Sequence, residues 1–329
     1  KGDEIIDGVN VCDIGASGSR FKRLLLRPWK MLFRARQLKA KSYHFHDPEL
    51  LLIALFLMIG GAKVIYDSHE DVPRSLLSRE WMSPWQRKVV SAVFEWFENF
   101  VVRRLSGVVG ATPFIADRFK ALNQNTIALN NYPMSSEIEM APVKNKERSN
   151  SVCYLGAISR IRGIEEMVKA LDHTEATLIL AGVFETQELE DKVRSFPGWE
   201  KVDFRGTVSR EEVREILSQS QAGIIVYHPE PNHVDAQPNK LFEYMSAGIP
   251  VIGSDFPLWK EIIEKDECGL CVDPLSPEAI GKAINEFVHH PENADEYGEN
   301  GRKVIVEKYS WKREEENLFD YYKCLVGSP

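Results

Sequence analysis

The sequence "PNKLFEYMSAGIPVIGSDFP", residues 238–257, places a short helical pattern directly before an apolar strand. Pro238 suits the first turn of a helix, because its missing N–H would have no partner there. Gly248 fits the position just after a helix end, and Pro250 prevents the helix from continuing. We therefore predict a helix over about 239–247 followed by a buried strand, which is the repeating unit of an α/β sheet.

The same alternation of apolar strands and helical patterns runs through the whole chain. It predicts an α/β protein with two Rossmann-like parallel-sheet domains that face a central cleft, with the ligand bound beyond the carboxyl ends of the strands. The polar stretch "APVKNKERSN" has the composition of a linker between them. The predicted domains are residues 1–135 and 136–308, with a C-terminal helix, 309–329, that crosses back to the first domain.

The composition is that of a soluble globular protein, with 43% hydrophobic and 27% charged residues. The five cysteines are sparse and odd in number, which favours a reducing compartment, so we expect a cytoplasmic protein. The chain opens on "KGDEIIDGVNVCDIG", part of a predicted hairpin with Asp7-Gly8 as its turn. Because a domain rarely begins with such a hairpin, we expect that an upstream segment has been removed.

The start of the 239–247 helix is a candidate anion site. A helix N-terminus offers free N–H groups and a partial positive charge, which stabilise an anion such as a diphosphate. Lys240 adds a full positive charge in the same turn, and Glu243 can accept hydrogen bonds from a ribose diol. The alternative is that Lys240 is simply solvated and that Glu243 only favours the helix dipole.

The same stretch resembles the donor-site segment of retaining glycosyltransferases of the GT-B fold, family 4. Members of that family carry two glutamates separated by seven residues. Glu243 matches the second glutamate, and the first falls on Asp235, so this chain has Asp-x7-Glu. The resemblance implies that the carboxylate at Asp235 lies by the donor hexose and that Glu243 holds the ribose.

Two further segments resemble the donor side of this family. "YLGAISRIRGIEEMVKAL" is similar to its glycine-containing loop, in which an Arg and a Lys clamp the donor diphosphate; here Ala157 and Arg162 occupy those positions. Arg160 is expected to compensate, because a guanidinium binds phosphate bidentately; alternatively, both arginines lie in a solvated loop. "VDFRGTVSREEVREIL" resembles the segment whose backbone meets the base. The predicted donor-binding residues are Gly156, Arg160, Arg162, Gly206, Thr207, Val208, Asn239, Lys240, Leu241 and Glu243.

In the first half, "YHFHDPELL" and "KVIYDSHEDVP" resemble the acceptor side of one bacterial branch of the family. His69 matches a family histidine placed near the transferring sugar, and His46, Asp47 and Glu70 are predicted acceptor-side residues. Without the resemblance, a histidine at a strand end is more often structural. We do not expect a metal site at His44-x-His46, because positions along a strand alternate between its two faces. The resemblance also implies that the chain lacks the family's first β-α-β segment.

The resemblance implies a glycosyltransferase that moves a hexose or N-acetylhexosamine from a nucleotide diphosphate sugar to a glycan or lipid-linked acceptor, with retention. The predicted catalytic residues are His69, Asp235 and Arg162. The chain contains no Asp-x-Asp motif, which favours a reaction without metal or other cofactor. Two alternatives stay open: a sugar-nucleotide epimerase of the same architecture, and a nucleotide-sugar-binding subunit without catalytic activity.

The stretch Arg20–Lys41 contains nine basic residues and no acidic residue. Subtracting these nine charges from the net charge of −8 leaves −17 for the rest of the chain. A basic helix that also carries Trp29 and Phe33 suits an anionic membrane surface, so we expect peripheral docking on the inner membrane face. The alternative is a helix that packs its apolar side on the sheet. Nucleic acid is not expected as a partner, because the rest of the chain is acidic.

Overall fold

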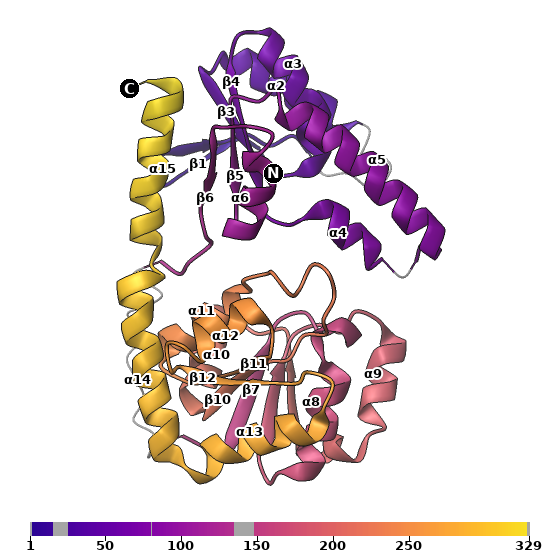
Figure 1. Ribbon diagram of the computed structural model, residues 1–329, viewed down its shortest axis with the longest axis vertical. Helices are drawn as coiled ribbons and strands as arrows, with labels where there is room; N and C mark the ends of the chain where they lie inside the picture. Colours follow the sequence, from indigo (N-terminus) through magenta and orange to yellow (C-terminus); the bar gives the residue numbers. More distant parts are fainter. Residues whose placement is uncertain (1, 16–25, 80, 135–147, 328–329) are drawn as a thin grey trace. The chain divides into compact units, whose positions relative to one another are not determined.

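The structure, a computed structural model, describes residues 2–15, 26–79, 81–134 and 148–327 (Figure 1). It divides into two compact units. The N-terminal unit comprises Lys1–Asn130 and Glu316–Pro329, and the C-terminal unit comprises Asn131–Glu315. The sequence placed these divisions at residues 135 and 308. Most of the predicted linker (141–147) and the first part of the basic stretch (20–25) lie outside the described residues.

The C-terminal unit contains a six-stranded parallel sheet with the order β12-β11-β10-β7-β8-β9. Its strands are β7 (Ser151–Leu155), β8 (Thr177–Ala181), β9 (Val202–Gly206), β10 (Ala222–Ile225), β11 (Val251–Ser254) and β12 (Gly269–Val272). Read along the chain, this is the Rossmann order 3-2-1-4-5-6. The order reverses between β7 and β10, and ligands of such sheets bind beyond the carboxyl ends of the strands at that point.

Among the residues of this unit that the structure describes, seven helices connect the strands or follow them: α8 (Ile164–Ala170), α9 (Gln187–Arg194), α10 (Arg210–Gln219), α11 (Asn239–Ala247), α12 (Pro257–Ile263), α13 (Pro277–His289) and α14 (Pro291–Lys308). The helix predicted over 239–247 is confirmed as α11. It begins after Pro238, and Gly248 ends it with a left-handed φ of 69°. Its buried face, with Phe242 and Tyr244, packs into the core of the sheet.

The N-terminal unit contains a four-stranded parallel sheet with the order β3-β4-β5-β6. Its strands are β3 (Ser42–Phe45), β4 (Lys63–Ser68), β5 (Gly107–Gly110) and β6 (Thr126–Ala128). The predicted hairpin is confirmed: β1 (Glu4–Ile6) and β2 (Val9–Val11) pair antiparallel through a turn at Asp7-Gly8, where both φ values are positive. The two parallel sheets confirm the predicted α/β class with two Rossmann-like domains.

The described helices within residues 1–130 of the N-terminal unit are α2 (Arg27–Leu38), α3 (Leu51–Ile59), α4 (Val72–Leu77), α5 (Pro84–Val102) and α6 (Pro113–Lys120), of which α4 was not predicted. The C-terminal helix α15 (Trp311–Val326) adds its second half to this unit. Tyr321 is buried, and its hydroxyl group donates to the carbonyl oxygen of Asn125 at 2.7 Å, with the carbonyl oxygen of Val108 at 3.2 Å as a second, more distant acceptor. Among the described helices, none has the length and apolar character needed to cross a bilayer.

Candidate functional site

The loops after β7 and β10 approach each other closely in the C-terminal unit. Gly163, at the end of the first loop, has a φ of 78°, and a Cβ atom there would lie 2.0 Å from the carbonyl oxygen of Val226. The backbone N–H of His228 donates to the carbonyl oxygen of Ile161 at 2.9 Å and joins the second loop to the 3₁₀ turn Arg160–Arg162. The sheet's reversal point is therefore bordered by a fixed, arginine-bearing turn.

Lys240 reaches from the first turn of α11 to the loop after β7. A Cβ atom on Gly156 would lie 2.5 Å from the Lys240 Nζ, so the ammonium group rests directly against this glycine. The Nζ also lies 5.7 Å from the centroid of the Tyr154 ring. The first turn of α11 has no acidic residue and no side-chain cap. Within the described part of the chain, no hydrogen bond or ion pair joins Lys240 to an anion.

Arg162 is the second cation at this place. Its Nη1 donates to the carbonyl oxygen of Ala157 at 3.3 Å, and its guanidinium carbon lies 5.7 Å from the centroid of the Tyr227 ring. Burial of Lys240, together with the positive charge of Arg162, lowers the pKa of the lysine to about 8, although Glu243 opposes the shift. Two neighbouring cations at a helix N-terminus are an arrangement that favours the binding of an anion.

Glu243 lies one turn further along α11 and borders a cavity of about 290 Å³. Its Oε1 accepts a hydrogen bond from the Arg210 Nη1 at 3.3 Å. The sequence did not single out Arg210, whose relation to Glu243 depends on the packing of α10 beside α11. The cavity is lined by Asn131, Tyr132, Pro133, Met134, Arg210, Asn239, Glu243 and Trp311.

The segment before α11 holds the other predicted carboxylate. Asp235 is half-buried in the turn that precedes Pro238. The Trp259 Nε1 donates to the carbonyl oxygen of Ala236 at 2.7 Å and anchors this segment. The Oε1 of Gln237 is buried without a hydrogen-bond partner among the described residues, so a polar ligand group could satisfy it. Sequence reasoning missed Gln237, because only the folded segment shows that its amide is buried.

The remaining predicted donor-binding residues occupy three places in the C-terminal unit. Gly206, with a φ of 62°, ends β9, and the exposed Thr207 and half-buried Val208 follow it before α10. Asn239 lines the cavity beside Glu243. Leu241 is fully buried in the core, and its N–H donates to the carbonyl oxygen of Pro238 at 3.0 Å. These assignments stay predictions.

The predicted acceptor-side residues follow β3 and β4 in the N-terminal unit. The His46 Nδ1 lies 3.0 Å from the His69 Nε2, and the exposed Asp47 and Glu70 are their chain neighbours. The expectation that His44 and His46 face opposite sides is wrong. Residues two apart on a strand share a face, and the two imidazole rings stack with their centroids 4.9 Å apart.

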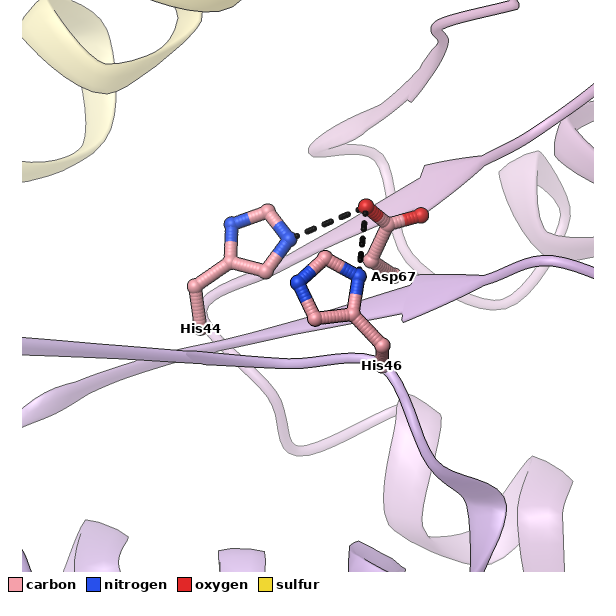
Figure 2. A group of neighbouring side chains, drawn as sticks. All are labelled: His44, His46 and Asp67. Carbon is pink, nitrogen blue, oxygen red and sulfur yellow. Dashed lines mark hydrogen bonds and ion pairs between the residues drawn. The ribbon is translucent and has the colours of Figure 1, made fainter. Parts of the chain in front are cut away.

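Asp67 joins these histidines, as Figure 2 shows for His44 and His46. Its side chain is only 15% exposed, and its Oδ2 lies 3.1 Å from the His44 Nε2 and 3.2 Å from the His46 Nδ1. Burial alone would raise the pKa of Asp67, but hydrogen bonds from His44 and His69 outweigh it and hold the pKa at about 2. The hydrogen bond with Asp67 raises the pKa of His69, whereas burial lowers the pKa of His46.

Comparison with known proteins then identifies the family. The family model "Glycosyl transferases group 1" matches residues 135–304, which include the cation pair and α11. The chain belongs to this family. An uncharacterized glycosyltransferase of Methanocaldococcus jannaschii is 26% identical over 180 residues, which cover 53% of this chain and 45% of that relative. The O-antigen chain mannosyltransferase C of Escherichia coli is 21% identical over 314 residues, or 91% of this chain and 80% of the relative.

Solved structures share the fold of this group 1 glycosyltransferase. The sucrose-phosphate synthase of Thermosynechococcus elongatus superposes with a TM-score of 0.79, at 19% identity, over 99% of this chain and 86% of that chain. HepE of Anabaena, solved in complex with UDP-glucose, superposes with a TM-score of 0.72, at 15% identity, over 93% and 84% of the two chains. The expected GT-B type of fold is thereby confirmed.

Proposed function

We propose that this group 1 glycosyltransferase moves a hexose or N-acetylhexosamine from a nucleotide diphosphate sugar to a glycan or lipid-linked acceptor, with retention of configuration. The observation that carries this proposal is the ammonium of Lys240, which is held beside Arg162 at the start of α11 and forms no hydrogen bond or ion pair with an anion among the described residues. A solved structure with the same fold binds UDP-glucose. A relative that spans most of the chain is a mannosyltransferase of O-antigen chains, which agrees with a glycan acceptor.

The proposed donor position follows from the charges. The diphosphate lies at the α11 N-terminus between Arg162 and Lys240, and the ribose diol donates hydrogen bonds to Glu243. The base meets the backbone of residues 206–208. The hexose lies by Asp235, where the buried Oε1 of Gln237 can accept a hydrogen bond from a sugar hydroxyl.

The chemistry of this arrangement is stabilisation of the leaving group. The bond between the anomeric carbon and the diphosphate oxygen breaks, and negative charge grows on the diphosphate as an oxocarbenium-like sugar forms. Fixed cations at that position stabilise the transition state more than the ground state. The acceptor oxygen then bonds to the anomeric carbon on the same face, and its proton passes to the departing phosphate oxygen. In this scheme the two protein cations neutralise the diphosphate without Mg²⁺ or Mn²⁺.

The experiment is incubation of the chain with a panel of UDP-, GDP- and dTDP-sugars in EDTA, with separation of the products. Slow release of nucleoside diphosphate from one donor, increased by a glycan acceptor, supports the proposal. Formation of an epimer of the donor would instead identify a sugar-nucleotide epimerase. Donor binding without any product would identify a non-catalytic binding subunit, and activity that needs Mg²⁺ would contradict the metal-free diphosphate site.

Gly156→Ala is expected to weaken donor binding about tenfold or more. A Cβ atom at this position meets the Lys240 Cε and Nζ at 2.5 Å, and a φ of 126° is also unfavourable for alanine. The lysine must therefore move, which removes its charge from the diphosphate position, and a tenfold loss corresponds to about 1.4 kcal/mol. Calorimetric titration with the nucleoside diphosphate measures the effect.

The matched control for this prediction is Gly61→Ala. Gly61 also has a positive φ, of 81°, but a Cβ atom at this position would meet no other atom within 4 Å, and the residue belongs to the other unit. It therefore introduces an alanine at a positive φ without displacing Lys240. Equal affinities for Gly156→Ala and Gly61→Ala would show that the contact with Lys240 does not matter for the donor.

We also propose that the enzyme docks peripherally on the anionic inner face of a membrane. Helix α2 carries part of the basic stretch and exposes Trp29 and Phe33. Helix α3 packs against both α2 and α5. Along α5, apolar side chains at helical spacing are exposed to solvent: Trp85, Val89, Val93, Trp96 and Phe100. Exposed tryptophans on an amphipathic helix suit the interfacial region of a bilayer.

The double substitution of Trp85 and Trp96 by serine is expected to lower binding to phosphatidylserine-containing vesicles at least about tenfold, because two interfacial anchors are removed. Flotation with vesicles measures the bound fraction. Phe319→Ser, which removes an exposed aromatic ring from α15, is the control and should bind as the wild type does. Equal flotation with neutral and anionic vesicles, or none with either, would contradict docking.

A further inference from the structure

A second cluster of polar side chains lies in the N-terminal unit, at the carboxyl ends of β3 and β4. The two strands pair in parallel with His44 opposite Ile65 and Phe45 opposite Tyr66. Continued by one residue, this register brings His46 beside Asp67. Because His44 and His46 are two residues apart, both imidazoles point to the same face and converge on this carboxylate (Figure 2).

Two distances in this cluster are close to those between the ligands of one metal ion. The His44 Nε2 and the His46 Nδ1 lie 3.1 and 3.2 Å from the Asp67 Oδ2. One donor atom from each residue lies within 4.8 Å of the others. In a tetrahedral zinc site with ligands at about 2.0–2.1 Å, adjacent donor atoms are about 3.3–3.4 Å apart. The two separations between an imidazole nitrogen and the carboxylate oxygen are within about 0.3 Å of this value.

We propose that His44, His46 and Asp67 bind a divalent transition-metal ion, of which zinc fits best. Two imidazole nitrogens and one carboxylate oxygen are a donor set that zinc accepts with a water molecule or another oxygen ligand in its fourth position. Magnesium and calcium prefer oxygen ligands, so the two imidazoles disfavour them. This inference concerns residues of the N-terminal unit alone and does not depend on the proposed donor site.

Neighbouring groups orient these three ligands. The hydroxyl group of Tyr322 is hydrogen-bonded to the His44 Nδ1, which directs the Nε2 toward Asp67. The His69 Nε2 lies 3.5 Å from the other carboxylate oxygen, Oδ1 of Asp67. Partners of this kind fix the tautomer and direction of metal ligands in many sites, and their loss typically weakens metal binding about 10- to 100-fold. The alternative is a hydrogen-bonded cluster that binds no ion.

The experiment uses the full chain without a histidine tag, stripped with EDTA and equilibrated with zinc by dialysis. We expect about one zinc ion per chain by elemental analysis. His46→Ala and Asp67→Asn should each lower the affinity for zinc at least about 100-fold, and Tyr322→Phe about tenfold. His290→Ala is the matched control, because the exposed His290 also lies near a carboxylate, with 3.5 Å between its Nδ1 and the Glu292 Oε1. This variant should keep the wild-type affinity for zinc.

Absorption of the Co²⁺-substituted chain gives a second readout, because a protein-bound tetrahedral ion absorbs more strongly than Co²⁺ in water. The His46 side chain is 60% exposed, so His46→Ala should fold even if Asp67→Asn does not. The proposal is overturned if the wild type retains no zinc, if folded His46→Ala binds zinc as tightly as the wild type, or if His290→Ala loses as much. If the wild type retains no zinc, the three residues form only a hydrogen-bonded cluster that binds no ion. That result would leave the transferase proposal intact.

Discussion

Lys240→Met is expected to lower kcat/KM with the identified donor about 100- to 1000-fold, the usual loss when one preorganised group that stabilises developing negative charge is removed. The ammonium of Lys240 forms no hydrogen bond or ion pair with an anion among the described residues and lies against Gly156 beside Arg162. Methionine keeps most of the length and apolar contact of the side chain. The substitution therefore removes charge from the position of the departing diphosphate and little else.

Steady-state release of nucleoside diphosphate measures this effect, and Lys282→Met is its control. Lys282 is an exposed lysine in α13 that pairs with Glu278 at 2.8 Å, and it lies in the same unit without bordering the site. The control should change the rate less than about twofold. A Lys240→Met enzyme with wild-type kcat/KM would show that the lysine takes no part in leaving-group stabilisation.

The lowered pKa of Lys240 adds a pH dependence to donor binding. In the free protein the lysine loses its charge as the pH rises through about 8. A bound diphosphate favours the charged form, so donor affinity should fall as the pH rises through this value. The stability of the ligand-free protein changes with pH in the opposite direction. Because the folded pKa lies below the ordinary 10.5, the unfolded chain holds the proton longer, and stability rises between these two pH values. Lys240→Met should lack both effects.

Arg118→Met is expected to destabilise the protein by about 3–5 kcal/mol, because it leaves a buried charge without its partner. The Glu98 side chain is completely buried, and its Oε2 is hydrogen-bonded to the Arg118 Nη2. The Tyr66 hydroxyl donates to the other oxygen, Oε1, at 3.3 Å. Arg118 also lies 3.4 Å from Asp71, so this second carboxylate loses a partner. Urea denaturation gives the free energy of unfolding.

The double variant with Arg118→Met and Glu98→Gln is the control for this mechanism. Removing the charge from both positions should recover most of the lost stability, since buried ion pairs are often replaceable by neutral groups. Burial already raises the pKa of Glu98 and the charge of Arg118 opposes this shift, so Arg118→Met raises it further. The single variant should therefore regain stability as the pH falls. A double variant as unstable as Arg118→Met would contradict the account.

The parts of the fold that were predictable depend on local chemistry. Pro238 and Gly248 fix the ends of α11 through their backbone restrictions, so the sequence alone was sufficient. The strand order, in contrast, could not be predicted from local sequence. The pairing of β7 with β10 joins residues that are about seventy positions apart, and nothing in either strand's composition specifies that neighbour. The location of the reversal point therefore came from the structure.

In the candidate sites, too, some features were predictable from the sequence and others depend on the fold. The sequence predicted the charge of Lys240 near a helix start, but only the folded loops show that it rests on Gly156 without an anion among the described residues. At the cluster of His44, His46 and Asp67, the sequence contains a usable signal, although the prediction made from it is wrong. His44 and His46 have the spacing that places side chains on one face of a strand. Asp67 completes the cluster only through the register of β3 with β4, which a single sequence does not reveal.

Whether Lys240 holds the donor diphosphate is tested most directly by a calorimetric titration of the wild type and of Lys240→Met with UDP, GDP and dTDP and with their nucleosides. We expect one nucleoside diphosphate to bind the wild type far more tightly than its nucleoside does. Lys240→Met should remove most of this difference while its affinity for the nucleoside stays unchanged. If the substitution weakens nucleoside and diphosphate equally, or neither, Lys240 does not hold the diphosphate, and the proposed mechanism is wrong.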